Sequence, residues 1–155
     1  MKLEKRGDDF ELVLVEREKE IFLSILDLYP RTPADHHRLT ETVASPELEN
    51  TRKLLDESIK IGRKEARKKL DGWLAEDDRF VSLKERVRLK IKADEIEWLL
   101  QVLNEIRVGS WVRLGAPETD LEMTNITPKN AADFGVMSMS GFFVMLLLEA
   151  MRGEG

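Results

Sequence analysis

A chain of 155 residues, 42% apolar and 35% charged, is long enough to bury one core, and its composition excludes wholesale disorder. The absence of cysteine excludes disulfides, thiol catalysis and cysteine-ligated metal centres, and it suits a reducing compartment. The net charge of −5 argues against general nucleic-acid binding, although residues 51–92 carry a surplus of basic side chains. We expect a single domain over residues 1–155.

The first regular elements are predicted near the N-terminus. Alternating apolar side chains indicate a half-buried strand over residues 10–15. A turn signal at Gly7 leaves residues 2–5 as a further candidate, paired in a hairpin. Apolar residues then recur every three or four positions, so a helix is expected over residues 16–29, ended by Pro30.

A long loop and a long charged helix are predicted next. Residues 30–45 contain prolines and few large apolar side chains, which indicates a loop that is either functional or poorly ordered. Pro46 follows Ser45, a typical capping residue, and apolar side chains then recur at helical spacing. A helix is therefore expected over residues 46–74.

The second half of the chain predicts a strand, two helices and an acidic loop. Alternating apolar and basic side chains indicate a strand over residues 86–92. Asp94 is the expected N-cap of a helix over residues 94–114. An acidic loop follows over residues 116–126, and a proline at the first helical position begins a last helix over residues 128–151.

The last predicted helix contains the most apolar stretch of the chain, residues 134–151. A membrane-spanning helix needs about 20 apolar residues. This stretch is shorter, and Ser138, Ser140 and Gly141 interrupt it. We therefore expect a buried central helix or a contact between copies of the chain, and no membrane.

Two segments of the chain are similar at a constant spacing of 77 positions. Residues 10–26 align with residues 87–103, and Leu12, for example, matches Leu89. Shared strand-then-helix patterning explains much of this similarity. The inference is structural: each strand is the best partner of the other, and we expect them to pair antiparallel under a helical layer.

These elements predict an α+β fold that is strongly α-dominated, with four main helices packed against a small two-stranded antiparallel sheet. The most buried side chains are expected to be those of Leu12, Leu14, Phe22, Leu26, Leu89, Ile91, Leu99, Leu103, Phe142, Met145 and Leu146.

The run LNEIRVGSWVRLG, Leu103–Gly115, resembles a signature of a bacterial family, domain-of-unknown-function family 2017. The segment RKLLDESIKIGRKEARKKLDGWL and the N-terminal strand with its acid-rich helix are also loosely similar to that family. The resemblance implies a bacterial cytoplasmic protein, and the family's gene neighbourhood beside the adaptor of the Clp protease implies a role near regulated proteolysis. The signature residues are matched by Asn104, Arg107, Arg113, Leu114 and Gly115, whereas Gly109, Ser110 and Trp111 depart from the pattern.

Three residues of that run are candidates for binding a ligand or a partner. Asn104 and Arg107 lie one turn apart on the same side of the predicted helix, and Arg113 follows near its end. These side chains are suited to a ligand carboxylate or to the carbonyls of a partner. The alternative, which we favour, is a structural contact between the helix and the acidic loop over residues 116–126.

A second candidate site is a basic stretch over residues 60–69. Its side chains recur at helical spacing and are suited to phosphate groups, with binding that weakens as salt rises. Interleaved acidic residues offer the alternative of an ordinary solvated face with ion pairs one turn apart. The basic side chains are those of Lys60, Arg63, Lys64, Arg67 and Lys68.

The search for catalytic chemistry gives no candidate. His36 and His37 are adjacent in the predicted loop, with Asp35 as the nearest further ligand, so exposed histidines are favoured over a metal site. No phosphate-binding glycine loop or nucleophile motif is present, and no cofactor is expected. The leading hypothesis is a non-enzymatic interaction or regulatory protein that binds a protein partner or itself. The alternative is a polyanion or nucleic-acid-binding module that uses the basic helix.

Overall fold

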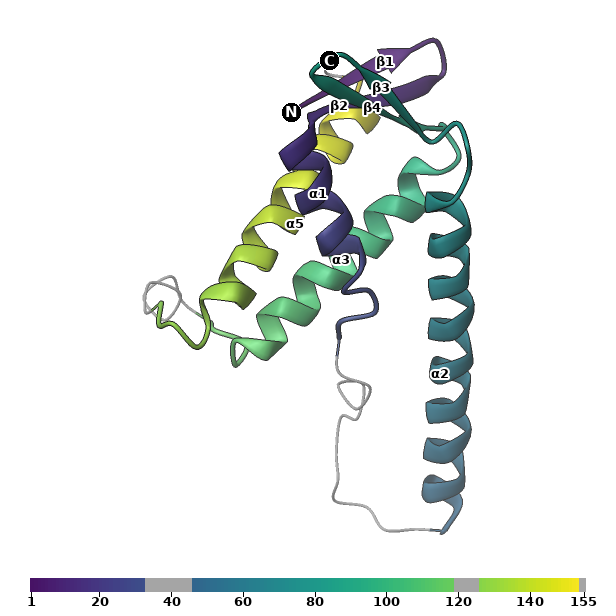
Figure 1. The fold of residues 1–155 in the computed structure, drawn as a ribbon. Coiled ribbons are helices and arrows are strands. Elements are labelled where there is room, and N and C mark those ends of the chain that lie inside the picture. The colour runs from purple at the N-terminus through teal and green to yellow at the C-terminus, as the bar shows by residue number, and fades with distance from the viewer. Residues whose placement is uncertain (33–45, 119–125, 154–155) are drawn as a thin grey trace.

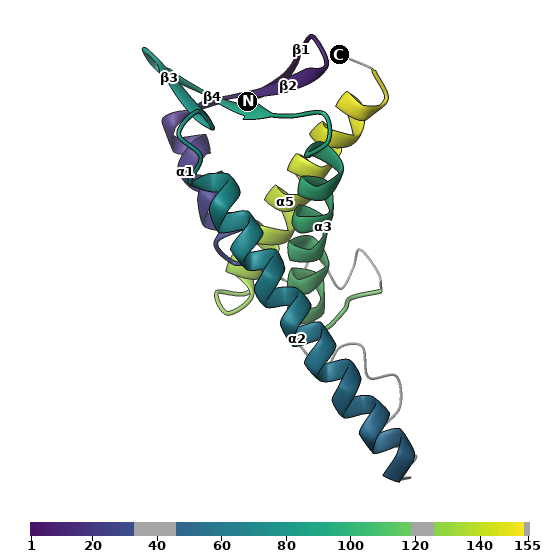
Figure 2. The ribbon, with the colours of Figure 1, turned by 90° about the vertical axis from the view of Figure 1, so that its right-hand side faces the viewer.

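The computed structural model describes residues 1–32, 46–118 and 126–153 (Figure 1). The regular structure of these residues consists of helices beneath one face of a four-stranded antiparallel sheet (Figure 2). The helix-dominated α+β fold is therefore confirmed, whereas the two-stranded sheet is wrong. Most of the two predicted loops lies outside the described residues.

The sheet is built from two β-hairpins. The predicted antiparallel pairing of the two alternating segments is confirmed, with Leu12 opposite Leu89 at its centre. Each of these strands also pairs with the strand that precedes it in the chain. The candidate strand over residues 2–5 is thus present. The strand over residues 80–83 was not predicted, because its four residues include a single aromatic side chain that packs against the core, Phe80. The order is β1 (Lys2–Arg6), β2 (Asp9–Val15), β4 (Arg86–Ile91) and β3 (Phe80–Leu83).

The four helices of the described residues lie close to their predicted positions. They are α1 (Glu16–Leu26), α2 (Pro46–Leu74), α3 (Ile96–Arg113) and α5 (Ala131–Met151).

Three helix ends differ from prediction. α1 ends early because the Tyr29 N–H donates to the Leu26 carbonyl three residues back, which closes a tight turn. Asp94 does not cap α3; Glu95 is the residue before the helix, and its side chain makes no capping bond. The last helix begins three residues late because Asn130 Oδ1 accepts the Thr127 N–H at 2.7 Å, which stabilises a turn there.

The similarity at a spacing of 77 positions extends to the order of the described elements. In the residues that the structure describes, each half runs strand, turn, strand, helix, helix, as β1-β2-α1-α2 and then β3-β4-α3-α5. The two hairpin turns place Gly7 and Lys84, 77 positions apart, at positive φ of 66° and 45°. Leu12 and Leu89 are also 77 positions apart and face each other in the sheet. The four-stranded sheet therefore has a local pseudo-twofold axis between these two leucines.

The start of α1 and the approach to α3 repeat the same interaction. The Val15 N–H donates to Glu18 at 3.0 Å, and 77 positions later the Lys92 N–H donates to Glu95 at the same distance. Both carboxylates satisfy a main-chain donor where the chain leaves a strand for a helix. The two halves are thus alike in their interactions as well as in their order of elements.

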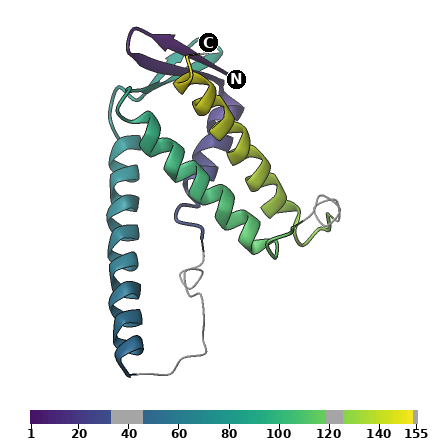
Figure 3. The ribbon, with the colours of Figure 1, turned by 180° about the vertical axis from the view of Figure 1, so that it is seen from behind.

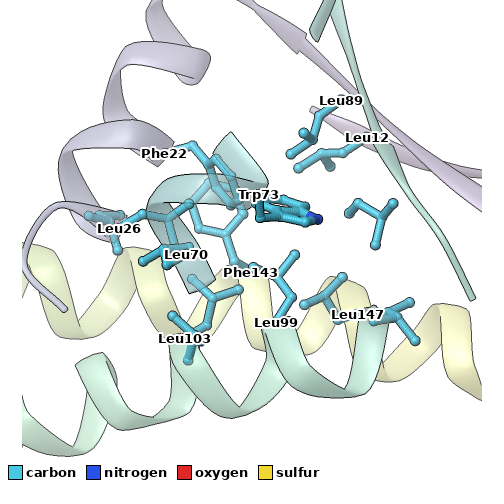
Figure 4. Packing of buried hydrophobic residues seen from close by; sticks show 14 of the residues in the cluster. Leu12, Phe22, Leu26, Leu70, Trp73, Leu89, Leu99, Leu103, Phe143 and Leu147 are labelled. Carbon is cyan, nitrogen blue, oxygen red and sulfur yellow. The ribbon is translucent and has the colours of Figure 1, made fainter. Parts of the chain in front are cut away.

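One cluster of buried side chains lies between the sheet and the helices (Figure 4). Phe22 of α1 meets Phe143 of α5 edge to face, with ring centroids 4.8 Å apart. The predicted burial of Phe142 and Met145 is wrong, because these side chains are 43% and 58% exposed, and Leu146 is only half-buried. α5 is apolar on almost every side, so its spacing could not show which side faces the core.

α2 extends beyond the rest of the fold, as Figures 1 and 2 show. Its 29 residues span about 43 Å at the usual helical rise. Only Leu70 and Trp73, near its C-terminal end, are buried. Residues 46–62 of α2 include no buried side chain.

Candidate interaction surfaces and polar clusters

The basic residues predicted as a polyanion site divide into two groups on α2. Lys60, Lys64 and Lys68 are exposed and form no ion pair with the described part of the chain. Arg63 and Arg67 are half-buried and face the rest of the fold. The prediction of polyanion binding therefore rests on the three lysines.

Arg67 and Arg63 connect α2 to the end of α1. Arg67 Nη1 donates to the carbonyls of Leu26 and Tyr29, at 2.9 and 3.1 Å. Arg63 Nη2 donates to the Thr32 carbonyl at 2.6 Å. The last carbonyls of a helix lack partners and carry partial negative charge, so a guanidinium there stabilises α1.

The most exposed aliphatic side chains of α2 lie on a single row. Leu54 is 68% exposed and Ile61 is 59% exposed. Spacings of three and four place them on one side of the helix with Glu57, Lys64 and Lys68, and we call these five residues the outer row. The outer row combines an apolar segment with a basic segment one turn further on.

Asn104 and Arg107 interact with each other on α3. Asn104 Oδ1 accepts from Nε and Nη2 of Arg107 at 3.1 and 2.8 Å. A side chain at Gly141 of α5 would come within 3.5 Å of the Arg107 Cδ, so the aliphatic stem of this arginine lies against α5. Arg107 thus contributes to the α3–α5 contact, and Asn104 orients its guanidinium.

Arg113 binds α5 as well. Its Nε donates to Asp133 Oδ1 at 2.9 Å, and the carboxylate of Asp133 also pairs with Arg31. The acidic partner of Arg113 in the described structure is therefore on α5, not on the predicted acidic loop, of which residues 119–125 lie outside the description. The three signature residues do not form one site, because Arg113 is held separately from the Asn104–Arg107 pair.

A polar cluster that sequence reasoning missed surrounds the backbone after α1, and we call it the Arg31 cluster. Glu105 of α3 accepts the N–H groups of Arg31 and Thr32, at 3.0 and 2.7 Å. The Arg31 Nε donates to Ser110 Oγ at 2.7 Å, and its guanidinium pairs with Asp133. A glutamate inside the signature run was the available signal, but a partner 74 positions away is not visible in sequence.

Gly109 allows this close approach. A Cβ at this position would lie 2.6 Å from both the Arg31 carbonyl carbon and the Thr32 nitrogen. The chain after α1 thus passes directly over α3 at Gly109. Nearby, burial and then the charge of Glu105 raise the pKa of Tyr29.

A second missed cluster surrounds Arg79, which is 3% exposed. Arg79 donates to the Lys90 carbonyl at 2.7 Å and pairs with Glu95 at 2.8 Å, while its guanidinium covers the Trp73 ring at 4.5 Å. Burial opposes ionisation of Glu95, but the nearby Trp73 indole N–H, the Lys92 N–H and Arg79 together hold its pKa below the usual value. Among the described residues the Trp73 indole N–H makes no hydrogen bond of ordinary geometry, so it acts on the Glu95 carboxylate as a nearby dipole.

The cavity beside the Arg79 cluster offers no catalytic constellation. Its volume is about 390 Å³, and side chains of both charges line it without a histidine or a hydroxyl nucleophile. No group of three potential metal ligands occurs within residues 1–32, 46–118 and 126–153. His36 and His37 lie outside these ranges, so their predicted exposure stays a prediction.

α5 is the one helix among the described residues that is long and apolar enough to cross a membrane by length and composition. A core helix of a soluble protein meets the same criterion. Phe143, Leu147 and Ser140 of α5 are buried in the fold, and the opposite side is exposed.

Comparison with protein-family models, with curated proteins and with solved structures gives no match for this chain. The resemblance to the bacterial family stays a prediction, and the function is inferred from the residues themselves.

Proposed function

We propose that this chain is a non-enzymatic interaction or regulatory protein that docks a protein partner on the outer row of α2. The observation that carries the proposal is the exposure of Leu54 and Ile61 on a helix that extends away from its own core. Large apolar side chains grouped on one side of a projecting element are typical of a binding surface.

The outer row also defines the chemistry of the partner. Burying a leucine or an isoleucine contributes about 1.5–3 kcal/mol, so an apolar surface opposite Leu54 and Ile61 supplies the affinity. Lys64 and Lys68 lie one and two turns further on, and acidic side chains of the partner opposite them favour one orientation. The partner is thus a protein with an apolar helix or groove that has an acidic end.

The family resemblance directs the first search towards regulated proteolysis in a bacterial cytoplasm. A protein that presents an exposed apolar row on a projecting helix, with no recognisable catalytic motif, suits an accessory role, in which binding alone changes the fate of a partner.

The experiment has two stages. A photo-crosslinking amino acid at position 54 captures the partner in the native cell, and the purified partner is then titrated calorimetrically. We expect Leu54→Ala with Ile61→Ala to weaken binding at least about tenfold, since about 1.4 kcal/mol corresponds to that factor. Glu49→Ala, on another side of the same helix, is the control with unchanged affinity. Equal affinity of the double alanine variant and the wild type refutes the proposal.

The second candidate function, polyanion binding, is favoured by the three free lysines. Lys60, Lys64 and Lys68 follow one another at four-residue spacing and have no competing carboxylate in the described structure. The affinity for duplex DNA or heparin is then expected to fall as salt rises. The variant with all three lysines replaced by alanine should show a smaller slope of log affinity against log salt concentration. No measurable binding at low salt, or the same slope for both proteins, removes this candidate.

A further inference from the structure

The exposed side of α5 is a regular stripe. Except for Ala132 and Met151, its exposed residues recur at spacings of four and three, the pattern of one side of a helix. No charged side chain occurs between Asp133 and Glu149. α5 forms one flank of the fold, opposite α2 (Figure 3). The stripe, which we call the α5 stripe, consists of Ala131, Gly135, Ser138, Phe142, Met145 and Glu149.

The fold itself does not require apolar side chains on this stripe. Glu65 and Lys68 of α2 lie 77 positions before Phe142 and Met145, and all four side chains are exposed. The same spacing relates two buried residues as well. Leu70 of α2 matches Leu147 of α5, and both are buried. Phe142 and Met145 are largely outside the core, so the core does not require apolar side chains at these two positions.

We propose that the α5 stripe is the docking surface for a second copy of this chain, with the two α5 helices antiparallel. The stripe is self-complementary when the two antiparallel helices are aligned so that Ser140 of one copy is level with Ser140 of the other. In that register Ser138 lies opposite Phe142 of the second copy, and Gly135 lies opposite Met145 of the second copy. Each large side chain therefore meets a small one, which lets the helices approach closely and fill the contact.

The ends of the stripe favour the same antiparallel register. Glu149 lies opposite Ala131 of the second copy, in the first turn of that helix, where a carboxylate is stabilised by the partial positive charge of the N-terminus. A parallel pair instead places Glu149 against Glu149 and Phe142 against Phe142. The twofold symmetry repeats every favourable contact, as in most homodimers.

Association is tested by sedimentation equilibrium of the full chain from about 1 to about 300 µM, the range in which a modest interface dissociates. The variant Phe142→Glu with Met145→Lys introduces the residues that lie 77 positions earlier on α2. We expect the wild type to be a dimer that dissociates on dilution. We expect the variant to stay a monomer over the whole concentration range. Its circular dichroism spectrum and melting temperature should equal those of the wild type at a dilution at which the wild type is a monomer. A wild type that stays monomeric overturns the proposal, and the occupant of the α5 stripe is then a bilayer or another protein. A variant that dimerises as well as the wild type also overturns it.

The register is tested with introduced cysteines, because the chain has none of its own. Gly135→Cys and Met145→Cys are prepared as separate single variants and oxidised alone and mixed. The antiparallel register brings residue 135 of one copy to residue 145 of the other, within the roughly 4–7 Å that a disulfide bridges between Cα atoms. Like residues are about 15 Å apart along the helix. Disulfide dimers are expected only in the mixture, and their formation by either variant alone overturns the register.

Discussion

Replacing Gly109 with alanine tests whether the close contact between α3 and the chain after α1 stabilises the fold. In an open helix, alanine is more stable than glycine by about 0.5–1 kcal/mol. Gly109, however, is buried, and an added Cβ would lie 2.6 Å from main-chain atoms of Arg31 and Thr32. Backbone cannot rotate aside as a flexible side chain does, so residues 31 and 32 must move away from α3.

That movement breaks the main-chain hydrogen bonds to Glu105. The carboxylate accepts the Arg31 and Thr32 N–H groups at 3.0 and 2.7 Å, and a hydrogen bond to a charged group contributes about 1.5–3 kcal/mol. Partial loss of both bonds, less the gain in helix propensity, predicts a net destabilisation of about 2–4 kcal/mol for Gly109→Ala. The free energy of unfolding is measured by urea denaturation followed by circular dichroism.

The matched control is Gly62→Ala on the exposed side of α2, where an added Cβ meets nothing within 4 Å. This variant should stabilise the protein by up to about 1 kcal/mol. In a double-mutant cycle, Glu105→Gln should cost much less in the Gly109→Ala background than in the wild type, because both changes weaken the same bonds. The reasoning is refuted if Gly109→Ala stabilises the protein as Gly62→Ala does.

Three further predictions follow from the core and the buried charges. Phe143→Ala should lower the free energy of unfolding by about 3–5 kcal/mol, whereas Phe142→Ala in dilute monomer should change it by less than about 1 kcal/mol; equal effects contradict the orientation of α5. Glu95 has a lowered folded-state pKa, so its stabilisation is present above the unfolded-state value near 4.5 and is lost as pH falls through the folded value. Glu95→Gln should therefore cost about 1–3 kcal/mol at neutral pH and progressively less in acid, as urea titrations at several pH values will show. Arg67→Met should cost about 1–2 kcal/mol in thermal unfolding while leaving any salt-dependent binding to heparin unchanged, since its donors cap α1; lost heparin affinity with unchanged stability contradicts this role.

Local pattern was sufficient where one side of an element faces water. The alternation in β2 and β4 showed which side chains enter the core, and Leu12 and Leu89 are accordingly buried opposite each other. The similarity at 77 positions pointed to the central pairing, and the structure extends it to both hairpins. β3 escaped prediction because four residues carry too little periodicity to stand out.

Local pattern failed where side chains on all sides are alike. α5 is apolar on almost every side, so sequence alone placed Phe142 in the core and structure places Phe143 there. The basic stretch of α2 was similarly ambiguous, and the position of α1 and the residues after it decided that Arg63 and Arg67 bind main-chain carbonyls, while the lysines form no ion pair with the described part of the chain.

The sequence by itself determined the class of fold, the positions of most helices and the central strand pair, because these depend on spacing along the chain. It also excluded cysteine chemistry, because composition alone decides that. Only the tertiary structure decided the roles of individual polar side chains: Glu105 meets Arg31 across 74 positions, and Arg113 meets Asp133 across 20. Such contacts depend on how the helices pack. The free energy that favours one packing comes from contacts throughout the core, so no local segment of the sequence determines it.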